Sequence, residues 1–317
     1  MNIVILDGYT LNPGDLDWSP LEKIGTLKVY ERTAVDDVVE RALDAEIVLT
    51  NKTKITGDAI KALPGLKYIG ELATGFDNVD IKAAAERNIP VCNVPGYSTS
   101  SVAQLTMALI LELVYKTGKR SEEVHAGAWV KSKDFCFGHV GLFELQGKTL
   151  GLIGLGQIGS AVAKIAMAFG MRVIASVRNP AKYNIEGVEF VSREDCFRRS
   201  DFISLHCPLT DDTRQMVNAS LINTMKPSAC IINTARGALI NEKDLTDALN
   251  NKRIAGAALD VLSTEPPSAD NPMFNAANCI ITPHIAWATK EARTRLLHES
   301  IKNIEAFLKG EERNVVN

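Results

Sequence analysis

The chain has 317 residues, of which 46% are hydrophobic and 23% are charged, and its formal net charge is -3 at pH 7. This length is enough for two domains or one large α/β domain, and the composition is ordinary for a soluble globular protein. The small negative charge excludes the basic excess that is typical of nucleic-acid-binding proteins.

The N-terminal residues MNIVILDGYT lack the basic segment and cleavage site of a signal peptide, and they favour a buried first strand. The longest apolar stretch, VAQLTMALILELVYK, contains Gln104 and Glu112. It is too short and too polar to span a bilayer, so it indicates a buried helix. The cysteines at positions 92, 136, 196, 207, 230 and 279 form no CxxC pair and no metal-ligand spacing. We therefore predict reduced thiols in a cytoplasmic protein and no metal site.

The first third of the chain alternates short apolar runs with helical patterns. Strands are predicted at 3–7, 47–50, 66–72 and 89–94, and helices at 36–43, 57–64 and 79–88. Such alternation predicts a parallel sheet with helices on both of its faces.

A second α/β series begins with a helix predicted over 99–118. A strand at 148–154 precedes an amphipathic helix that runs from Gln157 to its predicted C′ residue, Gly170. Further strands are predicted at 171–177, 201–207, 229–235, 254–261 and 278–284, and a long final helix at about 288–309.

Residues 125–147 show no regular pattern but are rich in aromatic side chains: Trp129, Phe135, Phe137 and Phe143. A mobile surface loop is one interpretation. However, so many aromatic rings are unfavourable in water, which favours a packed arm at a subunit interface.

The run GLGQIG places Gly154, Gly156 and Gly159 in the GxGxxG spacing, between an apolar strand and an amphipathic helix. In such a turn the first glycine permits the tight bend, and the second lets a pyrophosphate approach the backbone. The third allows the helix to pack closely on the strand, while the free N–H groups of the helix bind the anion. The motif therefore predicts dinucleotide binding, although a chance glycine turn is the alternative.

The stretch SVRNP, residues 176–180, lies about 20 residues after the glycines and lacks the acid that usually binds the adenosine ribose. Val177 stands where that acid is expected, so nothing there repels a 2′-phosphate. Arg178 can pair with the phosphate, and Ser176 and Asn179 can add hydrogen bonds. We therefore predict NADP as the preferred cofactor, with NAD possible. The alternative is that Arg178 points to solvent and NAD binds through its pyrophosphate.

Three charged residues follow predicted strands downstream of the glycines: Arg236 in NTARG, Glu265 in STEPP and His284 in TPHIAWAT. Sites of α/β sheets lie at the strand ends. An arginine can clamp a carboxylate, a histidine is a natural acid/base near neutral pH, and a glutamate beside an imidazole stabilises its charged form. Singly, these residues also fit a surface ion-pair partner, a solvated loop residue and a core histidine.

The glycine motif, HCPLTDDTR, NTARG, ALDV with EP, and TPHIAWAT follow one another in the order found in the D-isomer-specific 2-hydroxyacid dehydrogenases. The chain resembles this family over essentially its whole length, and most of all its glycerate dehydrogenase (hydroxypyruvate reductase) and glyoxylate reductase branch. The resemblance implies an α/β fold of two Rossmann-like or flavodoxin-like domains with parallel sheets and an active site in the interdomain cleft. Residues 1–97 and 286–317 would form the substrate-binding (catalytic) domain, and residues 98–285 the dinucleotide-binding domain, with a dimerisation arm at about 118–147.

The resemblance also assigns roles to individual residues. Arg236 would bind the substrate carboxylate, His284 would be the acid/base, and Glu265 would pair with His284. Backbone N–H groups near Thr74 and Gly75 would hold the same carboxylate. The implied cofactor-binding residues are Thr99, Val102, Gly154, Gly156, Gln157, Ile158, Gly159, Ser176, Arg178, Asn179, Cys207, Pro208, Thr213, Thr234, Ala235 and Asp260. Of these, Asp260 and the main-chain carbonyl of Thr234 would hydrogen-bond the nicotinamide carboxamide.

The expected reaction is hydride transfer between NAD(P)H and a small 2-oxo acid, namely hydroxypyruvate or glyoxylate to D-glycerate or glycolate. Glu71 in GELATG is expected to repel a phosphorylated substrate. Trp287 could line the substrate pocket or pack between domains.

The expected partners are the substrate and a second copy of the chain, with no nucleic acid and no membrane. The alternative is a dinucleotide-sensing corepressor of the same family, or an inert relative, while Glu265 argues against a formate dehydrogenase, which would carry Gln there.

Overall fold

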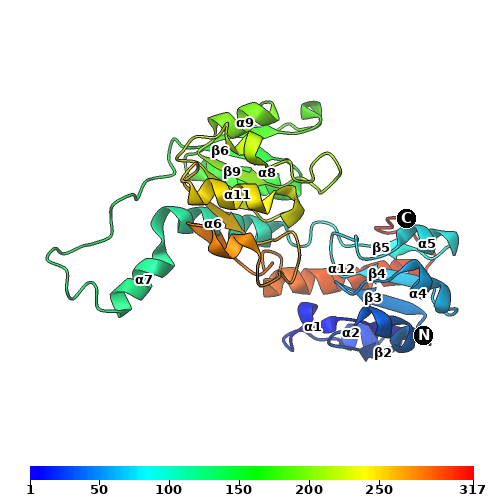
Figure 1. Cartoon of the computed structure of the whole chain (residues 1–317). Coiled ribbons are helices and arrows are strands. Elements are labelled where there is room, and N and C mark those ends of the chain that lie inside the picture. Colours follow the sequence, from blue (N-terminus) through cyan, green and yellow to red (C-terminus); the bar gives the residue numbers. More distant parts are fainter. The chain divides into compact units, whose positions relative to one another are not determined.

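Two parallel β-sheets organise the computed structural model, which describes residues 1–317 (Figure 1). They belong to two compact units, one formed by Met1–Ser98 with Trp287–Asn317 and the other by Thr99–Ala286. Each boundary lies one residue from the position expected from the sequence. The chain thus leaves the first unit after Ser98 and re-enters it at Trp287.

The first unit contains a five-stranded sheet in the order β2-β1-β3-β4-β5, with every pair parallel. This is the flavodoxin-like order, with its switch point between β1 and β3. The strands are β1 (Asn2–Ile5), β2 (Thr26–Val29), β3 (Ile47–Thr50), β4 (Tyr68–Glu71) and β5 (Val91–Cys92). The helices are α1 (Gly8–Leu11), α2 (Ser19–Glu22), α3 (Val38–Ala42) after the 3-10 turn η1 (Val35–Asp37), α4 (Gly57–Ala62), α5 (Ile81–Glu86) and α12 (Lys290–Leu308).

Apolar side chains cover both faces of this sheet. One core joins alternate strand residues such as Val4, Val48 and Ile69 to α3, α4 and α5. The other places Tyr68 and its neighbours against α12. Trp287 packs into this second core and meets Tyr97 edge-on, with 6.4 Å between ring centroids. The structure thus gives Trp287 a packing role within the first unit.

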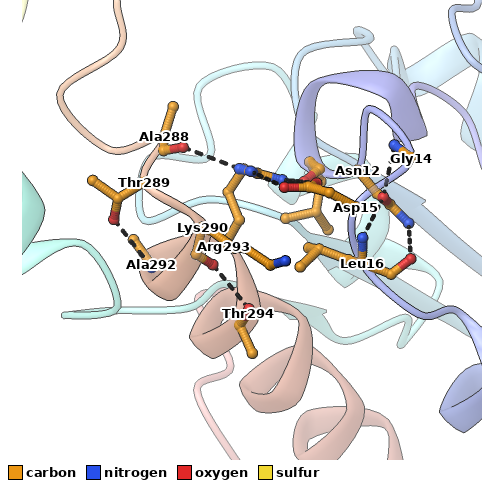
Figure 2. Close-up of polar contacts among 11 residues, drawn as sticks. Asn12, Gly14, Asp15, Leu16, Ala288, Thr289, Lys290, Ala292, Arg293 and Thr294 are labelled. Atoms are coloured by element: carbon orange, nitrogen blue, oxygen red, sulfur yellow. Dashed lines mark hydrogen bonds and ion pairs between the residues drawn. The ribbon is translucent and has the colours of Figure 1, made fainter.

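The start of α12 is fastened to the loop after α1 by Arg293, which is 8% exposed (Figure 2). Its two terminal nitrogens donate to the two carboxylate oxygens of Asp15, each at 2.7 Å. The same guanidinium donates to the carbonyls of Leu11 and Ala288 at 2.9 and 3.0 Å. A planar fork of donors suits this bidentate arrangement, so the C-terminal helix is tied to the N-terminal segment.

The second unit contains a seven-stranded parallel sheet in the order β12-β11-β10-β9-β6-β7-β8. Renumbered within the unit, this is the Rossmann order 3-2-1-4-5-6 with one added strand, and its switch point lies between β6 and β9. The strands are β6 (Thr149–Ile153), β7 (Arg172–Ser176), β8 (Val188–Phe190), β9 (Phe202–Leu205), β10 (Cys230–Asn233), β11 (Gly256–Leu259) and β12 (Cys279–Ile281). The two sheets confirm the predicted fold class.

The second unit contains six α-helices, and all of them except α7 have buried residues. They are α6 (Thr99–Tyr115), α7 (Thr117–His125), α8 (Gln157–Ala168), α9 (Arg193–Arg199), α10 (Ala219–Ile222) and α11 (Glu242–Asn250), with short 3-10 turns η2 (Pro180–Lys182), η3 (Gly237–Leu239) and η4 (Pro272–Asn275). The helix predicted over 99–118 is divided, because Lys116 takes the left-handed conformation with φ +52°. As predicted, Gly170 follows the end of α8 with φ +73°.

Residues 126–144 form a long segment without helix or strand, which extends with α7 away from the rest of the second unit (Figure 1). Several of its apolar side chains are exposed: Trp129 at 54%, Phe135 at 89% and Val140 at 87%. Phe143 is anchored at the base of the segment, where its ring stacks on Phe202 at 6.1 Å. Nothing within the chain covers the exposed side chains. In addition, no helix of the structure is long and apolar enough to cross a membrane.

Candidate active site

The candidate site residues of the second unit follow the carboxyl ends of its parallel strands, which meet at one edge of the sheet. Gly154 follows β6, Ser176 ends β7, Cys207 follows β9, Arg236 follows β10, Asp260 follows β11 and His284 follows β12. Residues spread over 130 positions of the sequence are therefore brought to one edge of one sheet.

Two of the three motif glycines sit where no side chain fits. Gly154 has φ +97°, and a Cβ there would lie 2.7 Å from the His206 carbonyl. A Cβ on Gly159 would lie 2.4 Å from the Gly154 carbonyl oxygen. The turn between β6 and α8 therefore requires both glycines.

Gly156 differs from the other two glycines, because a Cβ there would point into open space. It is also the N-cap of α8, and no side chain caps that helix end. Open space beside an uncapped helix N-terminus is what a bound pyrophosphate needs. The residues present thus fit a dinucleotide. Thr99, at the start of α6, donates to the Gln157 side chain at 3.3 Å and so links the starts of two helices next to this turn.

The segment after β9 forms a closed loop. The Thr213 hydroxyl accepts from the Thr210 N–H at 2.7 Å and donates to the Pro208 carbonyl at 2.8 Å. Thr213 thus shapes the loop that carries Cys207 and Pro208. Burial raises the pKa of the Cys207 thiol to about 11, so this side chain stays protonated near neutral pH. Packing around the neighbouring His206 lowers its pKa to about 4 and keeps it neutral.

Arg178 lies at the exposed end of the second unit's sheet, beyond β7. Its side chain is 84% exposed, and its nearest anion is Asp212, at 3.8 Å and 82% exposed. Such an exposed pair is weak, so Arg178 is available to a ligand. Asp212, which the sequence analysis did not single out, brings a negative charge to the place proposed for a 2′-phosphate.

The turn after β10 is shaped by Asn233, a fully buried residue that the sequence analysis did not single out. Its side chain accepts from the Ala235 N–H at 3.0 Å and donates to the Arg236 carbonyl at 2.8 Å. Arg236 is half-buried, and one of its terminal nitrogens donates to the Ala235 carbonyl at 2.9 Å. The Thr234 hydroxyl lies 3.0 Å from that of Thr106. This turn is therefore fixed by hydrogen bonds that are partly or fully buried.

His284 and Glu265 form a close pair, with 2.6 Å between His284 Nδ1 and Glu265 Oε2. The other carboxylate oxygen of Glu265 accepts from the Leu262 N–H at 3.1 Å. Both side chains are partly exposed, His284 at 26% and Glu265 at 33%. Because the carboxylate engages Nδ1, the opposite nitrogen, Nε2, is the one that can exchange a proton with a ligand.

Asp260 holds the segment around His284. It is 1% exposed, and its oxygens accept from the Thr282 hydroxyl at 2.6 Å and from the N–H groups of Ile285 and Ala286 at 2.9 and 2.8 Å. These bonds flank His284, whose φ of +53° is unfavourable for a residue with a side chain. Asp260 thus supports a strained backbone, as is common at functional sites.

In the first unit, the segment after β4 carries the other predicted substrate ligands. The Thr74 hydroxyl donates to the Val94 carbonyl at 2.9 Å, and the Thr74 carbonyl accepts from Asn93 at 2.7 Å. Two residues before Thr74, the Leu72 N–H donates to the Thr50 carbonyl at 2.6 Å. These bonds hold the backbone up to Thr74 in place, directly before Gly75.

The expectation that Glu71 repels a phosphorylated substrate is wrong. Glu71 ends β4, is 1% exposed, and its carboxyl oxygens have no hydrogen-bond partner. Burial raises the pKa of Glu71 to about 9, so the side chain is uncharged near neutral pH. It neither reaches solvent nor carries the charge that the repulsion needs. Glu71 is buried because every residue of β4 is buried, which the six-letter motif GELATG does not reveal.

Comparison with known proteins agrees with these observations. Residues 107–286 match the profile of the family described as D-isomer specific 2-hydroxyacid dehydrogenase, NAD binding domain. A hydroxypyruvate reductase of Blautia hydrogenotrophica is 48% identical over 322 residues, covering 100% of both chains. A glycerate dehydrogenase of Methylorubrum extorquens is 41% identical, with 91% of each chain covered.

Among solved structures, an acyclic imino acid reductase in complex with NADPH and D-Arg has a TM-score of 0.88 and 34% sequence identity, and all of both chains is covered. Sequence identity over whole chains, the family profile and the parallel sheet with its glycine turn all point the same way. The chain belongs to the D-isomer specific 2-hydroxyacid dehydrogenase family and is an oxidoreductase that uses a nicotinamide dinucleotide.

Proposed function

We propose that the protein reduces a small 2-oxo acid, hydroxypyruvate or glyoxylate, to D-glycerate or glycolate. The observation that carries this proposal is the His284–Glu265 pair, with 2.6 Å between Nδ1 and the carboxylate, on the sheet edge that bears the glycine turn. The hydroxypyruvate reductase and glycerate dehydrogenase among its relatives support these substrates over other 2-oxo acids.

In the proposed mechanism, the reduced nicotinamide supplies a hydride for the carbonyl carbon of the substrate when it is bound. Arg236 binds the substrate carboxylate and polarises the carbonyl. The protonated His284 donates its Nε2 proton to the carbonyl oxygen, which completes the alcohol. Glu265 orients the imidazole through Nδ1 and stabilises its charged form. In the reverse direction, neutral His284 accepts the hydroxyl proton through Nε2.

The remaining ligands are proposed from the family resemblance. Backbone N–H groups of Thr74 and Gly75 would bind the substrate carboxylate, and the cofactor residues named from the sequence would bind the dinucleotide. For Asp260 the proposed contact is with the nicotinamide carboxamide. The Asp260 carboxylate already accepts three hydrogen bonds, from Thr282, Ile285 and Ala286. A carboxylate can accept about four, so one further donor can be bound.

We also propose that NADPH is preferred over NADH. Support comes from the exposed Arg178, from the missing acid in SVRNP, and from the NADPH bound to the related imino acid reductase. Asp212 opposes the preference, because it stands 3.8 Å from Arg178.

A homodimer is proposed from the arm that follows α7. Phe135 and Val140 are nearly fully exposed, and a second copy of the chain would bury them. Sedimentation velocity is expected to show a dimer for the wild type and a monomer for the F135S/V140S variant. A monomeric wild type would contradict this proposal. A cytoplasmic location is proposed from the six free cysteines.

The test of the proposed mechanism is replacement of His284. The His284→Ala variant is expected to lose roughly 10²–10⁴ of the turnover number for hydroxypyruvate, because the general acid is removed. The dissociation constant for NADPH, measured by fluorescence titration, is expected to stay near the wild-type value. Wild-type turnover by this variant would remove His284 from the proposed role.

A further inference from the structure

The loop between β11 and η4 carries Glu265 without the support of a helix or strand. Residues 263–270 are all exposed, and the loop has no regular hydrogen-bonding pattern. Even so, Glu265 lies 2.6 Å from His284 Nδ1. Exposed loops of this kind sample many conformations unless their backbone is tied down. Some other element must therefore fix this loop.

Glu242, the first residue of α11, ties both ends of the loop with one carboxylate. One oxygen accepts from the Ser263 N–H at 2.6 Å, and the other accepts from the Asn271 side-chain amide at 2.9 Å. These two positions bracket Glu265, one two residues before it and the other six residues after it. Hydrogen bonds to an ionised acceptor are stronger than neutral ones, so the carboxylate suits this role.

The anchor itself is held firmly. Asn241 caps α11 by accepting from the Asp244 N–H at 3.1 Å, and Leu245 and Leu249 bury the inner face of the helix. At the far end, Asn271 is 6% exposed and caps η4 by accepting from the Met273 N–H at 2.9 Å. A negative charge in the first turn of α11 is favoured by the helix dipole.

The start of the loop is confined from the other side by Gly237. A Cβ on Gly237 would lie 1.9 Å from the Leu262 carbonyl carbon, so the turn after Arg236 presses directly on the residue before Ser263. Two adjacent N–H groups then meet two different carboxylates. The Leu262 N–H donates to Glu265 at 3.1 Å, and the Ser263 N–H donates to Glu242. Release of Ser263 would therefore disturb the amide that orients Glu265.

We infer that Glu242 is a positioning residue for the His284–Glu265 pair, acting through the loop that it clamps. This inference rests on the proposed function of that pair. Glu242 does not touch the reacting atoms. Its effect is on how long the Glu265 carboxylate stays against Nδ1, and so on how well the imidazole keeps its proton and its orientation.

Four variants, including one control and one reference, test this inference. Glu242→Ala removes both anchors, and Glu242→Gln keeps one oxygen that can accept from Ser263. Asp247→Asn is the matched control, because it neutralises a carboxylate on the same helix that makes only an exposed pair with Lys243. Glu265→Gln removes the carboxylate charge beside His284 and so gives the kcat and pH profile with which the other variants are compared.

The readouts are kcat, KM and the pH profile of kcat/KM for hydroxypyruvate, together with the NADPH dissociation constant. For Glu242→Ala we expect kcat to fall tenfold or more and the midpoint of the pH profile to move towards that of Glu265→Gln. Nucleotide affinity should be unchanged. Glu242→Gln should recover a large part of the loss, and Asp247→Asn should match the wild type. A wild-type kcat and pH profile in Glu242→Ala, or a lower melting temperature without any shift in the profile, would overturn the inference.

A measurement without turnover separates this inference from the proposed function. The ¹⁵N shifts of the His284 ring, followed against pH, report the state of the pair directly. We expect Asn271→Ala, which removes the far anchor and the cap of η4 but keeps the Ser263 bond, to shift this titration in the same direction as Glu242→Ala but less. If the wild type reduces neither keto acid, the proposed function fails while this titration still tests Glu242. If the titration is the same in all variants, Glu242 has no positioning role.

Discussion

Glu71, a buried acid at the end of β4, is expected to make the stability of the protein depend on pH. Burial raises the pKa of Glu71 from 4.5 to about 9, and the charge of Asp7 acts in the same direction. The Asp7 carboxylate accepts from the N–H groups of Asn51, Lys52 and Thr53, so it is held by the loop after β3. Between about pH 5 and 9, the folded chain therefore keeps a proton that the unfolded chain releases.

The expected consequence is a stability that falls as the pH rises. The contribution of Glu71 is fully present below the unfolded pKa and is lost as the pH rises towards 9, by up to about 1.4 kcal/mol per pH unit. The Glu71→Gln variant should lose this dependence. The check is urea unfolding at pH 6 and pH 9, with the exposed Glu86→Gln as the control. Equal pH dependence in wild type and Glu71→Gln would show that Glu71 does not hold the proton.

Arg178 and Asp212 give a paired prediction about the cofactor. Arg178→Asp should lower kcat/KM for NADPH about tenfold or more, because a charged hydrogen bond to the 2′-phosphate is replaced by repulsion. Asp212→Asn should change the NADPH/NADH ratio in the opposite direction. The measurement is the ratio of kcat/KM values at one keto-acid concentration series. An unchanged ratio in both variants would show that neither side chain reads the ribose.

At the scale of elements, the turn from β6 to α8 separates two kinds of glycine. Gly159→Ala should lower the melting temperature, because its Cβ would lie 2.4 Å from the Gly154 carbonyl oxygen. Gly156→Ala should leave the melting temperature unchanged and weaken NADPH binding, because its Cβ enters only the open space proposed for the pyrophosphate. Thermal unfolding and fluorescence titration check both. Tight NADPH binding by Gly156→Ala would mean that the pyrophosphate lies elsewhere.

The sequence was informative where elements have strong local patterns. The strands of both sheets other than β2 and β8 were predicted, because each of them lies in a continuous run of mainly apolar residues. β8 was missed because it is a three-residue edge strand, half-buried and paired only with β7. α9 and α11 were missed because they are short and carry many charged residues. The observed ends of the predicted strands and helices differ from the predicted ends by up to three residues, because caps and turns determine where each element ends.

The proposed site followed the same logic. Arg236, Glu265 and His284 could be proposed from the sequence because their residue types and their places after predicted strands are visible in the chain. Glu242, Asn233 and Asp212 were not singled out, because their roles come from contacts between distant segments. Glu242 reaches Ser263 and Asn271, which are 21 and 29 residues away. Such pairings depend on the folded backbone and leave no periodic signal in the sequence.

At the scale of the whole molecule, a flavodoxin-like unit and a Rossmann-like unit share one chain that crosses between them twice. Each unit has its own sheet and its own apolar cores. The His284–Glu265 pair and the turn proposed to bind the nucleotide belong to the second unit, whereas Thr74 and Gly75 belong to the first. The proposed reaction needs residues of both units, so neither unit alone is expected to be active.

Initial rates of nicotinamide oxidation test the central claim most directly. The wild type is measured with hydroxypyruvate, glyoxylate, pyruvate and 3-phosphohydroxypyruvate, each with NADPH and with NADH. We expect the highest kcat/KM for hydroxypyruvate or glyoxylate with NADPH, and loss of that activity in His284→Ala. Binding of the nucleotide without oxidation in the presence of either of these two keto acids would contradict it.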